Sequence, residues 1–162
     1  MVKIYLDSSA IVKRYIFETG SSAMDYLFDR SWAGEVSIAS SLWNIGEVLG
    51  VLDERRRRGW LDQSEYKKTL ESFVGETVRL TRLKVLELFP VSTPILVESW
   101  PLILDEGVYE ADALQIRTCM HSDSNAFLSS DKELISVALK TGLKAINVED
   151  EEKVKDLLHE GS

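Results

Sequence analysis

Residues 2–10 read Val2-Lys-Ile-Tyr-Leu-Asp-Ser-Ser-Ala10, an apolar run that ends at an acid and two serines. The β-branched and aromatic residues of this run predict a short strand over 2–6. Ser8 and Ser9 are typical helix N-caps, and the apolar residues that follow at helical spacing, from Ile11 to Ile16, predict a helix directly after the strand. A strand that runs into a helix in this way is the first half of a βαβ unit.

The same pattern recurs along the chain. Further strands are predicted at 36–39, 126–128 and 143–148, and helices at 42–58, 95–104, 108–120 and 151–159. One long helix is predicted from Asp62 to about Phe89, and Ser130 with Glu133 forms a predicted capping box. Alternating strands and helices favour the α/β class. We expect a single three-layer α/β/α sandwich around a short, mostly parallel sheet of four to five strands.

Length and composition limit the class of protein further. The chain has 162 residues, a net charge of −8 and one cysteine, Cys119, so no disulfide can form within it. No stretch is apolar enough for a signal peptide or a membrane span, which predicts a cytoplasmic protein that does not associate with a membrane. We expect a main domain over 1–148 and an acidic C-terminal helix and tail over 149–162 that belong to it.

The charge is distributed unevenly. Residues 51–84 hold nine basic and six acidic side chains, whereas residues 149–160 hold six acidic side chains and two lysines. Phosphate contacts need Lys and Arg, so the acidic total argues against a broad nucleic-acid surface, and the basic middle weakens that argument. An acidic C-terminal helix would repel phosphate groups near a site that acts on them, and we therefore expect it to pack behind the sheet.

Four acids stand where apolar residues are expected or where strands end. Asp7 follows the first strand, and Asp131 comes three residues after Leu128. Glu47 and Asp112 interrupt apolar helical segments, where an unpaired charge is costly to bury. In open α/β sheets, sites form at the carboxyl ends of the strands. The four acids together predict one acidic site there.

In the order of these motifs the sequence resembles the PIN domain family, small ribonucleases that include VapC-type toxins. The resemblance covers residues 2–148. Its four segments are Leu6-Asp7-Ser8-Ser9-Ala10, Ser41 with Glu47-Val-Leu49, Glu110-Ala-Asp112-Ala-Leu114, and Phe127-Leu-Ser-Ser-Asp131-Lys-Glu-Leu134 with the following Gly142-Leu143 and Ile146-Asn147.

The resemblance implies a metal-dependent endoribonuclease that hydrolyses RNA phosphodiester bonds. It implies that Asp7, Glu47, Asp112 and Asp131 are the catalytic acids that hold Mg²⁺ or Mn²⁺, with Ser129 or Ser130 as the hydroxyl near them. It further implies a homodimer and a cognate antitoxin partner. The residue chemistry agrees, because Mg²⁺ prefers a few carboxylates and several waters, and divalent ions can assist phosphodiester hydrolysis.

Candidate substrate-binding residues lie near these acids. Ser8, Ser129 and Ser130 are hydroxyls beside the predicted site, and Arg55 and Arg58 follow Glu47 on the same predicted helix. Arginine suits bidentate phosphate contacts. The alternative interpretation of the run Arg55–Arg58 is a solvated helix end, since four consecutive residues cannot share one face.

Other functions remain as alternatives. The main one is a catalytically silent PIN fold that binds RNA or a protein. A phosphatase of the haloacid dehalogenase type needs a second Asp two residues after the first, and Ser9 stands there. A receiver domain needs paired acids near the first strand, whereas Asp7 has no acidic neighbour.

Overall fold

A five-stranded sheet forms the centre of the computed structural model, which describes residues 1–159. All strand pairs are parallel, in the order β3-β2-β1-β4-β5. Ile4 of the central strand pairs with Ile38 on one side and with Ala126 on the other. The strands are β1 (Val2–Leu6), β2 (Val36–Ser41), β3 (Leu86–Phe89), β4 (Ala126–Ser129) and β5 (Ala145–Asn147). The expected α/β fold is confirmed.

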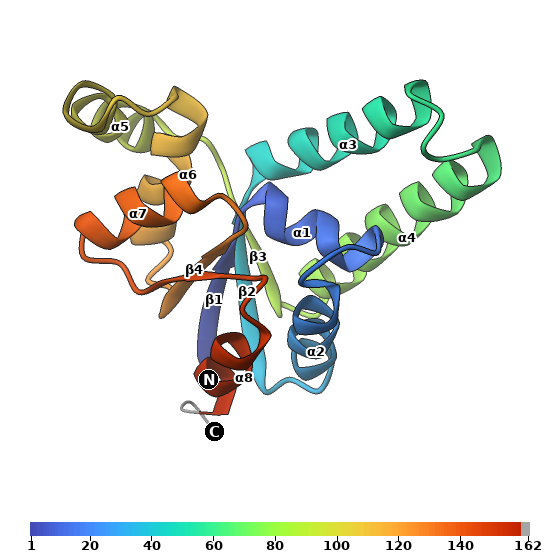
Figure 1. Cartoon of the computed structure of the whole chain (residues 1–162). Helices are drawn as coiled ribbons and strands as arrows, with labels where there is room; N and C mark the ends of the chain where they lie inside the picture. The colour runs from blue at the N-terminus through green and yellow to red at the C-terminus, as the bar shows by residue number, and fades with distance from the viewer. Residues whose placement is uncertain (160–162) are drawn as a thin grey trace.

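Helices cover both faces of the sheet, as Figure 1 shows. The helices are α1 (Ser8–Tyr15), α2 (Ser21–Trp32), α3 (Leu42–Arg57), α4 (Gln63–Arg82), α5 (Thr93–Glu106), α6 (Glu110–His121), α7 (Lys132–Lys140) and α8 (Glu151–His159). Ile4, Tyr5 and Leu6 are consequently all inaccessible to solvent, as is typical of a central parallel strand.

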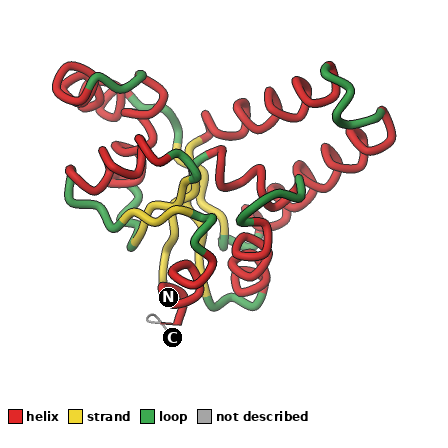
Figure 2. The backbone as a smooth tube through the Cα atoms, viewed as in Figure 1, coloured by secondary structure: helices red, strands yellow, loops and turns green. Residues whose placement is uncertain are grey.

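Two separate apolar clusters lie on the two faces. One contains Ile4 and Leu6 together with side chains of α1, α2, α3, α4 and α8. The other contains Tyr5 and side chains of α5, α6 and α7. Figure 2 shows α3 and α4 extending beyond the sheet as a hairpin, with their connecting loop at its tip. The candidate site described below lies at the carboxyl ends of the strands, and helices from both faces of the sheet contribute to it.

The long helix predicted from Asp62 to Phe89 is wrong in its second part. Helix α4 ends at Arg82, the backbone turns at Lys84 with a positive φ of 60°, and the edge strand β3 follows. The apolar residues of this short strand continue the helical spacing of the preceding segment, so periodicity alone did not separate them. The sheet therefore has five strands, the upper end of the expected range.

Helix α8 is part of the domain core. Val154, Leu157 and Leu158 are buried in the same cluster as Leu6, and α8 packs on α2. Gly20, at the start of α2, permits a close approach here, because a Cβ would lie 2.9 Å from the carbonyl oxygen of Val148. Helix α8 also packs against β5. Residues 160–162 of the predicted tail lie outside the described residues.

None of the helices within residues 1–159 combines the length and the hydropathy needed to cross a membrane.

If α8 is integral to the domain, Leu157→Ala should destabilise the protein by about 2–5 kcal/mol, the usual cost of removing a buried leucine. Urea unfolding monitored by circular dichroism measures this. Leu139→Ala is the matched control because Leu139 is 54% exposed, and it should change stability by less than about 0.5 kcal/mol. Equal effects of the two substitutions would contradict the packing of α8.

Candidate active site

Asp7 lies directly after the central strand and is only 4% exposed. Its side chain caps helix α1. The Oδ1 atom accepts hydrogen bonds from the backbone N–H of Ala10 at 2.9 Å and from the Ser9 hydroxyl at 2.7 Å. The prediction that Ser8 or Ser9 caps this helix is therefore wrong, since the acid one residue earlier reaches the free N–H groups of the first turn.

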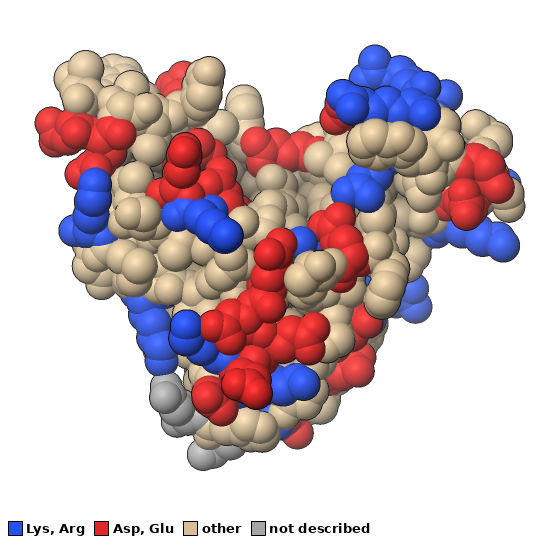
Figure 3. Space-filling view, in the orientation of Figure 1, with Lys and Arg blue, Asp and Glu red and all other residues tan. Residues whose placement is uncertain are grey.

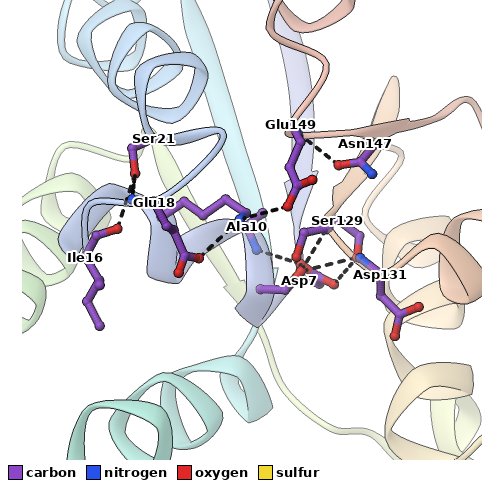
Figure 4. A network of polar contacts seen from close by, with 12 residues as sticks. Asp7, Ala10, Ile16, Glu18, Ser21, Ser129, Asp131, Asn147 and Glu149 are labelled. Atoms are coloured by element: carbon purple, nitrogen blue, oxygen red, sulfur yellow. Dashed lines mark hydrogen bonds and ion pairs between the residues drawn. The ribbon is translucent and has the colours of Figure 1, made fainter. Parts of the chain in front are cut away.

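Ser129, the last residue of β4, connects Asp7 to the next turn of the chain. Its hydroxyl donates to Asp7 Oδ2 at 2.5 Å and accepts from the backbone N–H of Asp131 at 2.9 Å. The backbone N–H of Ser130 donates to the Ser9 hydroxyl at 2.9 Å. Figure 4 shows Asp7, Ser129 and Asp131 close together at this point. The turns after β1 and β4 are thus joined through side chains.

Asp131 is exposed and caps helix α7. Its Oδ1 atom accepts from the backbone N–H groups of Glu133 at 2.9 Å and Leu134 at 3.1 Å. The predicted capping box of Ser130 with Glu133 is wrong, because the helix starts at Lys132 and the cap is Asp131. The second oxygen of Asp131 is not used in this cap.

The other two acids come from helices on opposite faces of the sheet. Glu47 lies on α3 and Asp112 lies in the first turn of α6, and both are partly buried. Burial raises the pKa of Asp112 above its usual range, and the negative charges of Asp131, Glu47 and Glu133 raise it further. These effects weaken with distance, so Asp112 lies within electrostatic range of the other three acids. Glu133 is an acid near the site that the sequence analysis placed only in a capping box.

Burial also raises the pKa of Asp7 from 3.8 to about 6. Hydrogen bonds from Ser129, Ser9 and Ala10 favour the charged form and limit this rise, while Glu47 adds to it. Electrostatic interactions therefore link Asp7 to Glu47, Glu47 to Asp112, and Asp112 to Asp131. The arrangement collects negative charge at the carboxyl ends of the strands.

The donor set fits a hard divalent cation. Carboxylate and hydroxyl oxygens are the ligands that Mg²⁺ and Mn²⁺ prefer, and a cation would relieve the repulsion that raises the pKa of Asp112. Within residues 1–159, no group of three or more Asp, Glu, His or Cys side chains is arranged so that it could hold a metal ion as it stands. The oxygens of Asp7 and one oxygen of Asp131 are instead directed to hydrogen-bond donors of the protein.

A pocket of about 230 Å³ adjoins Asp7. Its lining includes three serines, an arginine and a glutamate, together with two valines: Ser8, Ser9, Ser130, Arg55, Glu18, Val12 and Val51. Of the predicted substrate-binding residues, the structure thus brings Ser8, Ser130 and Arg55 together. Ser129 is fully buried and contacts Asp7 instead of the pocket.

Arg58 lies away from this pocket, at the end of α3. It pairs with Glu54 at 2.6 Å, and its guanidinium lies 5.1 Å from the centre of the Trp60 ring. Arg55 pairs with Glu18 at 2.9 Å. Figure 3 shows basic side chains gathered at the tip of the α3–α4 hairpin. It also shows acidic side chains along the hollow between this hairpin and the layer formed by α5, α6 and α7.

No family model and no curated protein matches the sequence. Solved structures do match. PAE2754 from Pyrobaculum aerophilum is 18% identical, with a TM-score of 0.66 over 98% of this chain and 90% of that chain. VapC20 from Mycobacterium tuberculosis, a sarcin–ricin loop cleaving toxin, is 17% identical, with a TM-score of 0.58 over 86% and 95%. VapBC2 from Rickettsia felis, solved with a DNA fragment from its promoter, is 12% identical, with a TM-score of 0.61 over 90% and 98%.

The parallel sheet with acids at the carboxyl ends of its strands defines an α/β protein with one polar edge. The structural matches over nearly the whole chain make the fold that of the PIN domain, as found in VapC proteins. The predicted resemblance is confirmed for the fold.

The raised pKa of Asp7 predicts a pH-dependent cost of stability. Because the folded-state pKa of about 6 exceeds the ordinary 3.8, stability should fall as pH rises from about 4 to about 6. Asp7→Asn removes this cost. In EDTA, the variant should gain stability relative to the wild type over this range, by roughly 3 kcal/mol at most. Urea unfolding at pH 4, 5, 6 and 7.5 measures the difference.

Asp53→Asn is the control with the opposite sign. The Asp53 carboxylate pairs with Arg56 and Arg57, which lower its pKa. Its stabilising contribution is present above the ordinary pKa of 3.8 and is lost as pH falls below it, so the stability deficit of Asp53→Asn relative to the wild type should be constant from about pH 5 to 7.5 and should shrink only toward about pH 4 and below. A pH-independent difference for Asp7→Asn would contradict the burial of a titrating carboxylate at this position.

Proposed function

We propose that this protein is a divalent-metal-dependent endoribonuclease that hydrolyses RNA phosphodiester bonds. The observation that carries the proposal is the electrostatic linkage of four carboxylates, the buried Asp7 and those of Glu47, Asp112 and Asp131, at the carboxyl ends of the strands. Packing alone gives no reason to gather so much negative charge, because like charges raise each other's pKa and destabilise the fold. A cation together with a phosphate-bearing substrate gives such a reason.

In this proposal Asp7, Glu47, Asp112 and Asp131 hold Mg²⁺ or Mn²⁺. A bound divalent cation supplies positive charge for the phosphate oxygens and Lewis acidity for the attacking water. Asp7 keeps its orientation through the hydrogen bonds of Ser9 and Ser129. The exposed Asp131 is the acid most open to solvent, and it adjoins Ser130 at the rim of the neighbouring pocket.

RNA would enter along the hollow between α3 and the layer formed by α5, α6 and α7. Ser8, Ser130 and Arg55 line the pocket beside Asp7 and would contact a phosphate group there. The Arg55 guanidinium would exchange its partner Glu18 for that phosphate. Arg58, on the exposed end of α3, would contact a more distant phosphate.

The biological role that we propose is that of a VapC-type toxin or a close relative acting in the cytoplasm. The support is the fold shared with VapC20, a toxin that cleaves the sarcin–ricin loop. A cognate antitoxin and a second copy of this chain are the proposed protein partners. Helix α5 offers an apolar stripe for the second copy, since Val97, Trp100 and Leu104 are 44%, 54% and 85% exposed at helical spacing.

The activity can be tested with Asp7→Asn. The wild-type protein should cleave RNA with Mg²⁺ or Mn²⁺ and not with EDTA, and the variant should lose roughly 100-fold or more of the rate, about 2.7 kcal/mol in transition-state stabilisation. Gel analysis of a labelled RNA pool measures cleavage. Asp29→Asn, which alters a carboxylate that is 73% exposed on α2, should retain the full rate.

A wild-type protein that binds RNA but does not cut it with either Mg²⁺ or Mn²⁺ would favour the alternative of a silent PIN fold. Equal cleavage by both proteins, each free of contaminating nuclease, would contradict the assigned acids.

The basic side chains give a separate prediction. Arg55→Gln should raise KM for RNA with little change in kcat, and should reduce the slope of log K against log salt by about 0.7 if it contacts one phosphate. Arg58→Gln should lower the slope similarly and raise KM less. Fluorescence anisotropy at several salt concentrations measures both. Arg82→Gln is the control, because Arg82 lies at the end of α4 away from the hairpin tip, and it should leave the slope unchanged.

A further inference from the structure

The two helices that carry Glu47 and Asp112 are anchored in different apolar clusters. Helix α3 contributes Val48 and Leu52 to the cluster on one face of the sheet. Helix α6 contributes Ala113 and Ile116 to the cluster on the other face. Packing within either cluster therefore positions one helix against the sheet and does not by itself fix the distance between the two helices.

A buried polar bridge does join them. The Asn44 side-chain N–H on α3 donates to Gln115 Oε1 on α6 at 2.9 Å, and the Tyr5 hydroxyl of β1 donates to the same oxygen at 2.6 Å. Asn44 and Tyr5 are fully buried, and Gln115 is 3% exposed. This bridge of Tyr5, Asn44 and Gln115 is thus excluded from solvent and lies between the two layers.

The bridge is also tied to the ends of the strands. Asn44 Nδ2 lies 3.1 Å from the carbonyl oxygen of Leu6 and 2.8 Å from the Ser40 hydroxyl, which itself donates to the Leu6 carbonyl. Leu6 directly precedes Asp7. The bridge therefore contacts the backbone next to the buried acid as well as both flanking helices.

The two helical residues of the bridge each lie three residues from one of the acids. Asn44 precedes Glu47 by three residues on α3, and Gln115 follows Asp112 by three residues on α6. Residues three apart lie on the same side of a helix, about one turn from each other. A shift of either helix that broke the Asn44–Gln115 hydrogen bond would therefore move its carboxylate as well.

The bridge is a poor device for stability alone. Asn44 Oδ1 and Gln115 Nε2 are buried without a hydrogen-bond partner among the described residues. Unpaired buried polar groups cost free energy, and an apolar pair of similar shape would avoid that cost. An amide–amide contact specifies one distance and one orientation between the helices, which an apolar pair does not.

We propose that Asn44 and Gln115, held by Tyr5, are positioning residues that set the spacing of Glu47 and Asp112 and thereby the affinity for a divalent cation. This inference rests on the proposed function. Hydrogen-bonded residues behind metal ligands commonly alter affinity by 10–100-fold when they are removed. The bridge acts in the same way, but on helices instead of on single ligands.

The test measures Mn²⁺ binding to the whole chain by electron paramagnetic resonance, without RNA. Gln115→Met and Asn44→Leu should each weaken Mn²⁺ binding about tenfold or more. The double variant should bind little more weakly than either single variant, because both substitutions break the same hydrogen bond. If Asn44→Leu does not fold, Gln115→Met carries the test alone.

Ile116→Val is the matched control, since Ile116 is the fully buried neighbour of Gln115 on α6 and packs in the apolar cluster. It should lower stability and leave Mn²⁺ affinity within about twofold. Tyr5→Phe, which removes one hydroxyl and keeps the Asn44–Gln115 hydrogen bond, should weaken binding less than Gln115→Met. In cleavage assays Gln115→Met should lower kcat at saturating RNA with KM for RNA unchanged.

The outcomes separate this inference from the proposed function. If Asp7→Asn abolishes Mn²⁺ binding and Gln115→Met binds as tightly as Ile116→Val, the positioning role is wrong and the metal site stands. If Asp7→Asn and the wild type bind Mn²⁺ equally, the proposed metal site itself is wrong. Additive losses in the double variant would show that the two side chains act separately and would overturn the bridge.

Discussion

The carboxylate of Asp7 is buried at the end of the central strand, and hydrogen bonds from the start of α1 and the end of β4 hold it there. A buried charge must be satisfied, and this requirement determines the local structure. The first turn of α1 supplies Ser9 and Ala10, and the end of β4 supplies Ser129. The position of Asp131 follows in turn, since its backbone N–H donates to the same serine. One acid thus aligns the starts of two helices.

The sequence was informative where a residue departed from a regular pattern. Asp7 and Asp131 followed predicted strands, and Glu47 and Asp112 interrupted apolar helices. Parallel strands bring such positions to one edge of the sheet, so the approximate location of a candidate site could be predicted. The resemblance of the motifs in order then added the fold.

Other features of the structure did not interrupt any regular pattern in the sequence. Strand β3 continues the helical spacing of α4, and only pairing with β2 makes it a strand. Asn44 and Gln115 look like ordinary polar residues of exposed helix faces, and their burial follows from how α3 and α6 meet over the sheet. Glu133, on α7, likewise acts electrostatically on Asp112 of α6. These are tertiary relations between distant segments, which local patterns do not encode.

The run of four arginines illustrates the limits of counting charges. Each of the four pairs with a nearby acid: Arg55 with Glu18, Arg56 and Arg57 with Asp53, and Arg58 with Glu54. The local field is therefore weaker than four positive charges would produce. The hairpin presents guanidinium groups that can exchange a carboxylate for a phosphate. Their contribution is a specific contact geometry more than a strong long-range attraction.

The packing of α8 on α2 has a consequence for how the protein is made. Every predicted catalytic acid lies before residue 132, whereas Val154 and Leu157 close the core beneath α2 only after α8 has been synthesised. At translation rates of about 5–20 residues per second, α8 is made on the order of a second or more after Asp131, and until then the apolar surface of α2 stays open. A nascent chain in that interval offers chaperones a binding surface that the finished protein hides. The order of synthesis therefore delays the final closure of the fold until after the site residues have been made.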